Sequence, residues 1–175
     1  MRIIKLTFLM SIMLATLKSQ GQTAIKELRV GHEFFISVPD YMTKTVGLNS
    51  AASVQFKNVI KDVAGFVIED PNVDLKLAEL NFASINEYYD YFVKDFLKDE
   101  EKRTISNPNV FKKGQNNYLE IDASYFDKDS KVDIYYYVCL IETRDYYYKL
   151  LCWSSLENKD KFKSDFQKIA YSLRD

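Results

Sequence analysis

Few residues in this sequence have the types and spacing that catalysis requires. The only histidine is His32, and a Ser-His-Asp or Cys-His site would need it as the base that activates the nucleophile. It stands between Gly31 and Glu33, just before an apolar stretch, where a surface residue at the start of a strand is the simpler interpretation. One histidine and two cysteines also fall short of the usual ligand sets of zinc sites. We therefore expect no catalytic residue, no metal site and no cofactor.

Acidic residues are numerous, but their spacing matches no defined site. Asp127, Asp129 and Asp133 surround an Asp-Lys-Asp-Ser segment, and closely spaced carboxylates can bind Ca²⁺. The segment lacks the central glycine and terminal glutamate of an EF-hand loop, so a solvated hairpin turn is the favoured interpretation. The acids at 69–70 and 99–101 would suit glycoside hydrolysis only at a particular separation, which the sequence does not define. The five glycines are isolated, which excludes a glycine-rich phosphate loop.

Tyrosine is the unusual residue type, with 13 in 175 residues. Two triplets lie on adjacent expected strands, and successive side chains on a strand point to opposite faces. Core and cross-strand packing is the favoured interpretation, because tyrosine prefers strands. The functional alternative is an exposed aromatic patch or groove that binds a protein, a peptide or a glycan. The candidate binding residues are Tyr135, Tyr136, Tyr137, Tyr146, Tyr147 and Tyr148.

The N-terminus has the pattern of a secretory signal peptide. Arg2 and Lys5 form a basic start, residues 6–17 are mostly apolar, and the small residues Ser19 and Gly21 follow. The apolar run is too short to cross the hydrocarbon core of a membrane, which needs about 20 residues. An N-terminal anchor helix or a buried helix is the alternative. We predict a signal peptide at 1–21, cleaved after Gly21 or alternatively after Ser19, and no integral membrane segment after cleavage.

The remaining chain, 22–175, is expected to form one domain in the periplasm or outside the cell. Hydrophobic residues make up 47% and charged residues 28% of the sequence, which is ordinary for a globular domain. Removing 1–21 takes away three basic residues and no acids, so 21 basic residues remain against 25 acidic ones, a formal net charge of −4. Nucleic acid and anionic membranes are poor partners for such a surface, because both favour a basic patch.

Strand and helix patterns alternate in an order that indicates an α+β fold. Ser84 and Glu87 form a capping box at the start of an amphipathic helix that should end near Lys102. A second amphipathic helix is expected at 158–173. The segment 73–80 is ambiguous, and a short helix is slightly favoured there. We expect a mainly antiparallel sheet of about six strands packed between helices, because each element has an apolar face to cover. Strand-like segments lie at 33–38, 53–60, 63–69, 110–113, 118–126, 131–141 and 146–154.

The last two strands should pair around a four-residue turn at 142–145. A turn centred between Thr143 and Arg144 places Cys139 opposite Tyr148, so Cys152 lies four residues further along. That offset is roughly 13 Å, whereas a disulfide needs Cα atoms within about 7 Å. We therefore predict two buried free thiols, although an even cysteine count in an exported chain favours a disulfide. One face of the pair holds Tyr135, Tyr137, Cys139, Ile141, Tyr146, Tyr148, Leu150 and Cys152, and the other holds Tyr136, Val138, Leu140, Tyr147, Lys149, Leu151 and Trp153.

Two stretches resemble the PsbP/DcrB-like superfamily of small exported domains. One is Phe34-Phe35-Ile36-Ser37-Val38-Pro39 followed by Tyr41-Met42, and the other is the ending Phe162-x3-Phe166-x2-Ile169-x2-Ser172-Leu173. The likeness covers about 30–174, and the aromatic residue after the proline, often Trp in such domains, is Tyr41 here. The resemblance implies an α/β/α sandwich and a role in binding or assembly. Members share no catalytic residues, so no residue role is carried over.

These observations favour a non-enzymatic binding or accessory protein whose partner is a protein or another component of the cell envelope. A carrier of a small apolar ligand is the second hypothesis, and it predicts a cavity of roughly several hundred Å³ under the helix at 84–102. A small hydrolase is the third, and it predicts a deep pocket that holds two or more acids.

Overall fold

Antiparallel strand pairs make up most of the computed structural model, which describes residues 23–30 and 34–175. The predicted signal peptide at 1–21 and His32 lie outside the described residues. In the part described, no helix has both the length and the apolar character that crossing a membrane requires.

The main sheet has the strand order β3-β4-β5-β10-β9-β8-β6, and β7 also pairs with β8. All of its pairings are antiparallel. A separate two-stranded sheet consists of β1 (Ile25–Val30) and β2 (Phe34–Pro39). The strands of the main sheet are β3 (Thr43–Thr45), β4 (Val54–Asn58), β5 (Val63–Pro71), β6 (Glu101–Ile105), β7 (Asn109–Lys113), β8 (Asn116–Asp127), β9 (Val132–Glu142) and β10 (Tyr146–Ser155).

The predicted α+β class is confirmed, but the expected number of about six strands is wrong, because the main sheet has eight. The unexpected strands are β1, β3 and β6. They are short or rich in charged residues, so the alternation of apolar and polar residues that marks a half-buried strand is weak in them.

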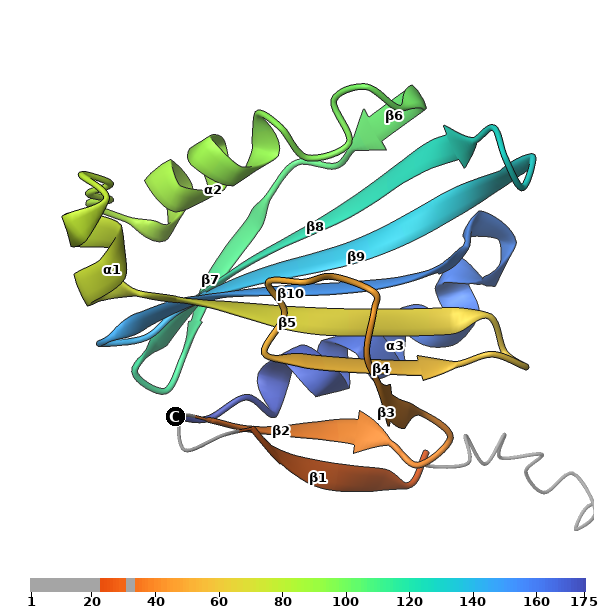
Figure 1. Cartoon of the computed structure of the whole chain (residues 1–175), viewed down its shortest axis with the longest axis horizontal. Coiled ribbons are helices and arrows are strands. Elements are labelled where there is room, and N and C mark those ends of the chain that lie inside the picture. The colour runs from red at the N-terminus through yellow and green to blue at the C-terminus, as the bar shows by residue number, and fades with distance from the viewer. Residues whose placement is uncertain (1–22, 31–33) are drawn as a thin grey trace, which may run out of the picture.

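Helices cover both faces of the main sheet, as Figure 1 shows. Helix α2 (Ile85–Val93) packs against β8 and β9 on one face. Helix α3 (Lys159–Tyr171) packs against β9 and β10 on the other face, where it also contacts β2. A short helix α1 (Asn72–Leu77) follows β5 directly, and a 3-10 turn η1 (Leu156–Asn158) leads into α3.

Helix α2 begins as predicted and ends earlier than predicted. The Ser84 Oγ accepts a hydrogen bond from the Glu87 backbone N–H at 3.4 Å, and the Glu87 carboxylate accepts one from the Ala83 N–H at 2.8 Å. The prediction that the helix reaches Lys102 is wrong. Leu97 adopts a left-handed conformation with φ of +55°, which an α-helix cannot continue, and β6 begins at 101.

The β9–β10 hairpin turns one residue later than predicted. Thr143 pairs with Tyr146 through a 2.9 Å backbone hydrogen bond, so Arg144 and Asp145 form the turn. Cys139 therefore lies opposite Leu150, and the predicted pairing with Tyr148 is wrong by two residues. Because a shift of two residues keeps every side chain on its face, the predicted division of the hairpin into two faces is confirmed.

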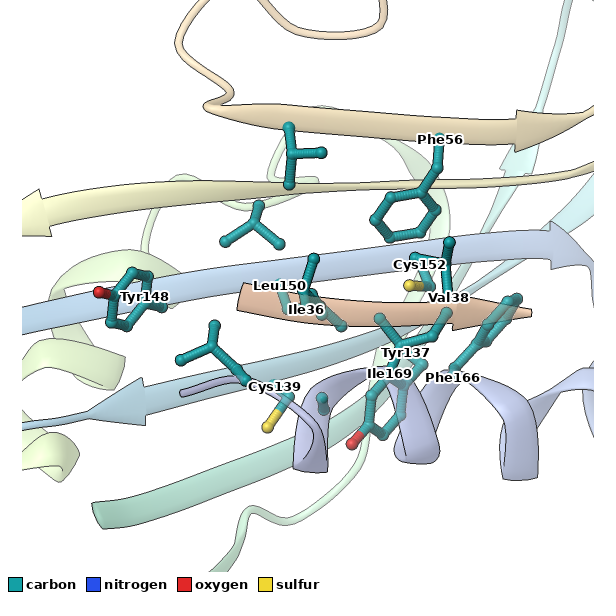
Figure 2. Close-up of a cluster of buried hydrophobic side chains, with 14 of the residues drawn as sticks. Ile36, Val38, Phe56, Tyr137, Cys139, Tyr148, Leu150, Cys152, Phe166 and Ile169 are labelled. Carbon is teal, nitrogen blue, oxygen red and sulfur yellow. The ribbon is translucent and has the colours of Figure 1, made fainter. Parts of the chain in front are cut away.

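Each face of the main sheet carries its own buried core. The core under α3 and β2, part of which is drawn in Figure 2, contains Ile36, Phe56, Tyr137, Phe166 and Ile169 among its members. The core under α2 is smaller and includes Ile85, Tyr88, Leu119, Leu140 and Leu151.

The two cysteines lie in the larger core as buried free thiols. Cys152 faces Tyr137, two residues from the partner position of Cys139, which makes the cysteines diagonal neighbours. Diagonal Cα atoms on paired strands are about 7–8 Å apart, and a disulfide requires less than about 6.8 Å. The two cysteines are free thiols as predicted, but the distance between them exceeds the disulfide limit by less than the predicted register implied.

Candidate functional site

The structure divides the six candidate tyrosines between the core and its margin. Tyr135, Tyr137, Tyr147 and Tyr148 are buried, so the exposed-patch interpretation is wrong for these four, and core packing accounts for them. Tyr136 and Tyr146 are half-buried. The triplets split across the sheet because consecutive residues of a strand face opposite sides.

Each of the four buried tyrosines donates its phenol hydroxyl to a carboxylate. A buried hydroxyl needs such an acceptor, since leaving it unpaired costs the hydration that it lost. Three further tyrosines do the same: Tyr41 donates to Asp165 at 2.9 Å, Tyr88 to Asp70, and Tyr171 to Glu120. The four hairpin bonds are Tyr135–Asp122 at 2.7 Å, Tyr137–Glu120 at 2.5 Å, Tyr147–Glu142 at 3.0 Å and Tyr148–Asp175 at 3.3 Å.

These environments keep the phenols protonated. Burial raises the pKa of Tyr135, Tyr137 and Tyr148 far above the ordinary value, and the adjacent carboxylates raise it further. Burial likewise raises the pKa of the Cys139 and Cys152 thiols. A nucleophilic cysteine or a basic tyrosine needs the opposite shift, so these residues serve packing and hydrogen bonding rather than reaction chemistry.

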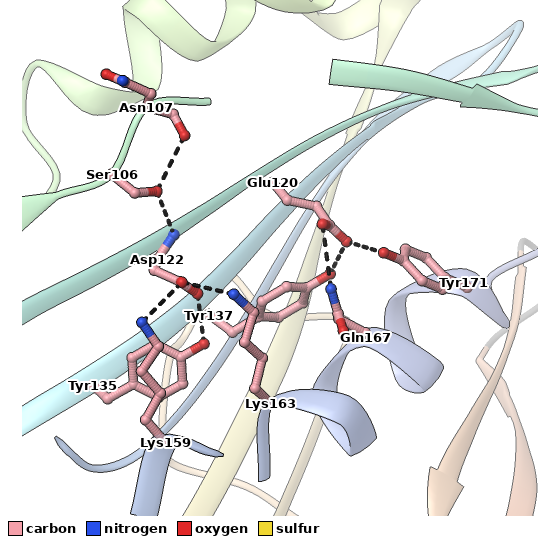
Figure 3. Close-up of polar contacts among 10 residues, drawn as sticks. All are labelled: Ser106, Asn107, Glu120, Asp122, Tyr135, Tyr137, Lys159, Lys163, Gln167 and Tyr171. Atoms are coloured by element: carbon pink, nitrogen blue, oxygen red, sulfur yellow. Dashed lines mark hydrogen bonds and ion pairs between the residues drawn. The ribbon is translucent and has the colours of Figure 1, made fainter. Parts of the chain in front are cut away.

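A row of polar contacts joins α3 to β8, and we call it the α3–β8 seam (Figure 3). Side chains four residues apart on a helix are separated by about 6 Å along its axis, and alternate residues of a strand by about 6.8 Å. The two spacings match closely enough for successive side chains to meet. The seam consists of Lys159, Lys163, Gln167 and Tyr171 on α3 and Glu120 and Asp122 on β8.

Both carboxylates of the seam are engaged by protein donors. The Asp122 Oδ2 lies 2.9 Å from the Lys159 Nζ and 2.7 Å from the Lys163 Nζ. Burial alone would raise the pKa of Asp122, but the bonds from Lys163, Tyr135 and Lys159 outweigh burial and lower it. Such a carboxylate is ionised and held in place at neutral pH, which suits the docking of α3 on the sheet better than a general acid.

The Asp-Lys-Asp-Ser segment forms the predicted turn. The Asp127 Oδ1 accepts a bond from the Asp129 N–H at 3.2 Å, and its Oδ2 accepts one from the Ser130 hydroxyl at 2.5 Å. The Ser130 bond, followed by the Asp129 bond, lowers the pKa of Asp127. Across residues 23–30 and 34–175, no group of three or more His, Cys, Asp or Glu side chains is arranged to hold a metal ion.

Four aromatic rings cross the α2-facing side of the sheet in a continuous row, which we call the aromatic ladder. Phe66 on β5 lies 5.8 Å from Trp153 on β10, measured between ring centroids. Trp153 lies 5.5 Å from Tyr136 on β9, and Tyr136 lies 6.2 Å from Tyr125 on β8. Phe66 is buried, and the other three rings are half-buried. Helix α2 packs on the opposite end of β10, where Tyr88 stacks on Tyr147 at 4.3 Å, and Phe96, beyond the end of α2, contacts Tyr136 at 5.6 Å.

The ladder is the part of the candidate site that the sequence indicated only partly. Tyr136 was among the predicted binding residues, and Trp153 was correctly placed on its face. Tyr125 follows from the same alternation along β8, since it lies two residues beyond Ala123, the partner of Tyr136. What the sequence lacked was the position of α2 and of the segment after it relative to these rings.

A pocket of about 630 Å³ lies on the other side of the molecule. It is not under α2, where the carrier hypothesis placed a cavity, but among the start of β1, the end of β7 and the end of α3. Its lining residues include Ile25, Lys113, Lys168 and Tyr171. The Lys113 Nζ donates to the Tyr171 carbonyl at 3.1 Å, and the Lys168 Nζ pairs with Asp165 at 3.1 Å.

Comparison with known proteins finds no matching family model and no matching curated protein. Solved structures of the PsbP-like class, however, share the fold of this chain, as the resemblance predicted. The solution structure of cyanobacterial PsbP (CyanoP) from Synechocystis sp. PCC 6803 matches with a TM-score of 0.62 and 16% identity, over 92% of this chain and 98% of that one.

Two further structures match in the same way. LpqN of Mycobacterium tuberculosis, described as involved in cell envelope biogenesis, matches with a TM-score of 0.55 and 13% identity, over 85% of this chain and 90% of that one. Protein PA94 of Pseudomonas aeruginosa, of unknown function and described as a putative regulator, matches with a TM-score of 0.50 and 11% identity, over 82% and 92%. At these identities the likeness establishes the fold alone.

Proposed function

We propose that this chain is an exported, non-enzymatic accessory protein of the cell envelope that binds a protein or another envelope component through the aromatic ladder. The observation that carries the proposal is the row of half-buried rings, Trp153, Tyr136 and Tyr125, on a sheet face that α2 covers only in part. Large rings with polar tips provide contact area at little entropic cost, which is why they dominate binding surfaces.

Two further observations support the proposal. The buried tyrosines, the two thiols and Asp122 of the seam are held by burial and by hydrogen bonds in states that suit packing. In addition, the fold is shared with LpqN, whose described involvement is in cell envelope biogenesis. An envelope role agrees with the signal peptide predicted at 1–21.

The test is capture of partners from envelope extract by the exported protein and by its variants. Trp153→Ala and Tyr125→Ala each remove a ring of the ladder, and we expect both to lose the captured component. Tyr91→Ala is the matched control, because it removes an aromatic ring that is 49% exposed on α2 outside the ladder. Melting curves verify that each variant is folded. Equal capture by all four proteins would contradict the proposal.

A carrier of a small apolar ligand is the second candidate, and the pocket of about 630 Å³ favours it. That volume is within the range of about 300–1,000 Å³ that ligand pockets occupy. A ligand screen read by melting temperature separates the candidates. The carrier is favoured if an apolar compound raises the melting temperature, if a Tyr171→Ser variant loses this stabilisation, and if the capture experiments enrich no partner.

A further inference from the structure

Strand β1 lies at the outer margin of its two-stranded sheet (Figure 1). One edge of β1 pairs with β2, and among the described residues no other strand pairs with it. The far edge of β2 is occupied differently, because Phe35 exchanges backbone hydrogen bonds with Arg174 and the Ser37 N–H donates to the Ser172 hydroxyl. The open edge of this sheet is therefore that of β1, and an open edge is a template for a further strand.

The hydrogen-bond phase of β1 shows which residues face that open edge. The Asp40 N–H donates to the Ala24 carbonyl at 2.8 Å, and 24 and 40 follow the same register that pairs Lys26 with Val38. Hydrogen-bonded and non-hydrogen-bonded pairs alternate along an antiparallel ladder. Even-numbered residues of β1 therefore bond to β2, and the backbone groups of Ile25, Glu27 and Arg29 point outward.

This phase restricts how two copies of β1 could pair antiparallel. Hydrogen-bonded pairs must join odd-numbered residues, so the centred registers place Glu27 opposite Glu27, Glu27 opposite Arg29, or Arg29 opposite Arg29. The first and third put like charges directly opposite each other, which is destabilising. The second pairs opposite charges twice, once on each side of a two-fold axis at Leu28.

The side chains that this register joins are available on the solvent side of β1, where Glu27 and Arg29 are exposed. Glu27 already contacts Arg174 of its own chain, and the Arg29 guanidinium lies 5.8 Å from the centre of the Phe35 ring. A carboxylate has two oxygens with about four acceptor sites, so Glu27 can accept from Arg174 and from a second guanidinium together.

We propose that β1 pairs with β1 of a second copy of this chain, antiparallel and centred on Leu28, to form a two-fold dimer with a continuous four-stranded sheet. A two-fold interface is self-complementary, as the Glu27–Arg29 pattern requires. The aromatic ladder lies on the α2-facing side of the main sheet, and β1 and β2 lie on the α3 side. Such a dimer would leave both ladders open, so it could bind a repetitive partner with avidity.

The test is charge reversal read by sedimentation velocity over a range of concentrations, with the protein recovered after export. Arg29→Glu places two acids opposite each other at both sites of the interface, and we expect the dimer to weaken at least about tenfold. The double variant Glu27→Arg with Arg29→Glu restores opposite charges in the same register, so it should recover the wild-type dimer. Lys26→Glu is the control, because the backbone N–H and C=O of Lys26 bond to β2 and its side chain lies opposite no charged residue of the second copy in this register.

Melting curves and far-ultraviolet circular dichroism verify that each variant is folded. A wild-type protein that stays monomeric up to about 1 mM would overturn the proposal. So would a dimer that Arg29→Glu leaves unchanged, or one that the double variant fails to restore while its fold is intact. Partner capture through the ladder is measured separately, so failure of the dimer and failure of the proposed function are distinguishable.

Discussion

A buried tyrosine differs from a buried phenylalanine in one respect, because its hydroxyl must find an acceptor inside the protein. Seven tyrosines of this chain find a carboxylate, and these carboxylates come from β5, β8, β9, α3 and the C-terminal residue. The acids that looked like scattered surface charge in the sequence are therefore partly acceptors for core hydroxyls. No local pattern predicts these pairs, since tyrosine and acid are usually distant in sequence.

Removing one hydroxyl that donates to a carboxylate of the seam should destabilise the fold. Tyr137→Phe deprives the buried Glu120 of its 2.5 Å donor and leaves it with Tyr171 and Gln167. We expect a loss of about 1–2 kcal/mol in the free energy of unfolding, measured by urea denaturation. Tyr91→Phe, at an exposed position on α2, should change it by less than about 0.5 kcal/mol. Equal effects of the two changes would show that the Glu120 bond does not matter.

Alkaline pH should unfold the protein in step with tyrosine ionisation. The folded phenols have a raised pKa, whereas the unfolded ones titrate near the ordinary value of about 10. Their contribution is therefore complete below about pH 10 and is lost as pH rises, by about 1.4 kcal/mol per pH unit for each phenol that stays protonated. Phenolate absorbance and circular dichroism should change together. Ionisation of all 13 tyrosines near pH 10 in a folded protein would refute this account.

At the scale of elements, close packing at Gly65 shows how tightly β4, β5 and β10 are joined. A Cβ at this position would lie 2.7 Å from both the Cys152 Sγ and the Phe56 Cε2, and 2.9 Å from the Leu151 carbonyl oxygen. Glycine is thus required because a neighbouring backbone atom and two core side chains approach it. In the sequence it was only one of five isolated glycines.

Gly65→Ala should therefore cost more stability than another glycine substitution. We expect a loss of at least about 2 kcal/mol from overpacking, measured as a shift in the urea midpoint. Gly114→Ala is the matched control, since its φ is +63° and no atom lies within 4 Å of the added Cβ. Its cost should be only about 1 kcal/mol, from the left-handed backbone alone. A smaller loss of stability for Gly65→Ala than for Gly114→Ala would mean that the strands around Gly65 can shift to accommodate the added methyl group.

The elements that the sequence predicted best are those with long, regular apolar patterns. The β9–β10 hairpin, α3 and the start of α2 follow from periodicity and from the capping box at Ser84. The end of α2 could not be predicted, because the apolar spacing continues through Phe96 and Leu97, whereas the backbone at Leu97 turns left-handed. The register error at Thr143 has a similar origin, because a hairpin turn of two residues and one of four look alike in composition.

At the scale of the whole molecule, the separation into two faces followed from the alternation of residues along β9 and β10. A shift of two residues in register left it intact, which is why the buried and half-buried tyrosines could be assigned to faces before their neighbours were known. The aromatic ladder required more, namely how far α2 extends over the sheet. That depends on contacts between residues distant in sequence, which a single sequence does not specify.

The predicted export can be tested by the mass of the protein recovered from outside the cytoplasm. We expect a chain that begins at Gln22, after removal of residues 1–21. Cleavage after Ser19 is the predicted alternative, and the mass resolves the two. A recovered chain of the full 175 residues would contradict the signal peptide and favour an anchor helix.

The central claim is that the aromatic ladder binds a partner, and its single tryptophan allows a direct measurement. Trp153 is half-buried, so acrylamide should quench its fluorescence in the folded protein, though less than after unfolding. Addition of the component captured from the envelope should protect Trp153 from quenching and shift its emission to shorter wavelength. Quenching and emission that stay the same while the component is bound would show that the partner contacts another surface.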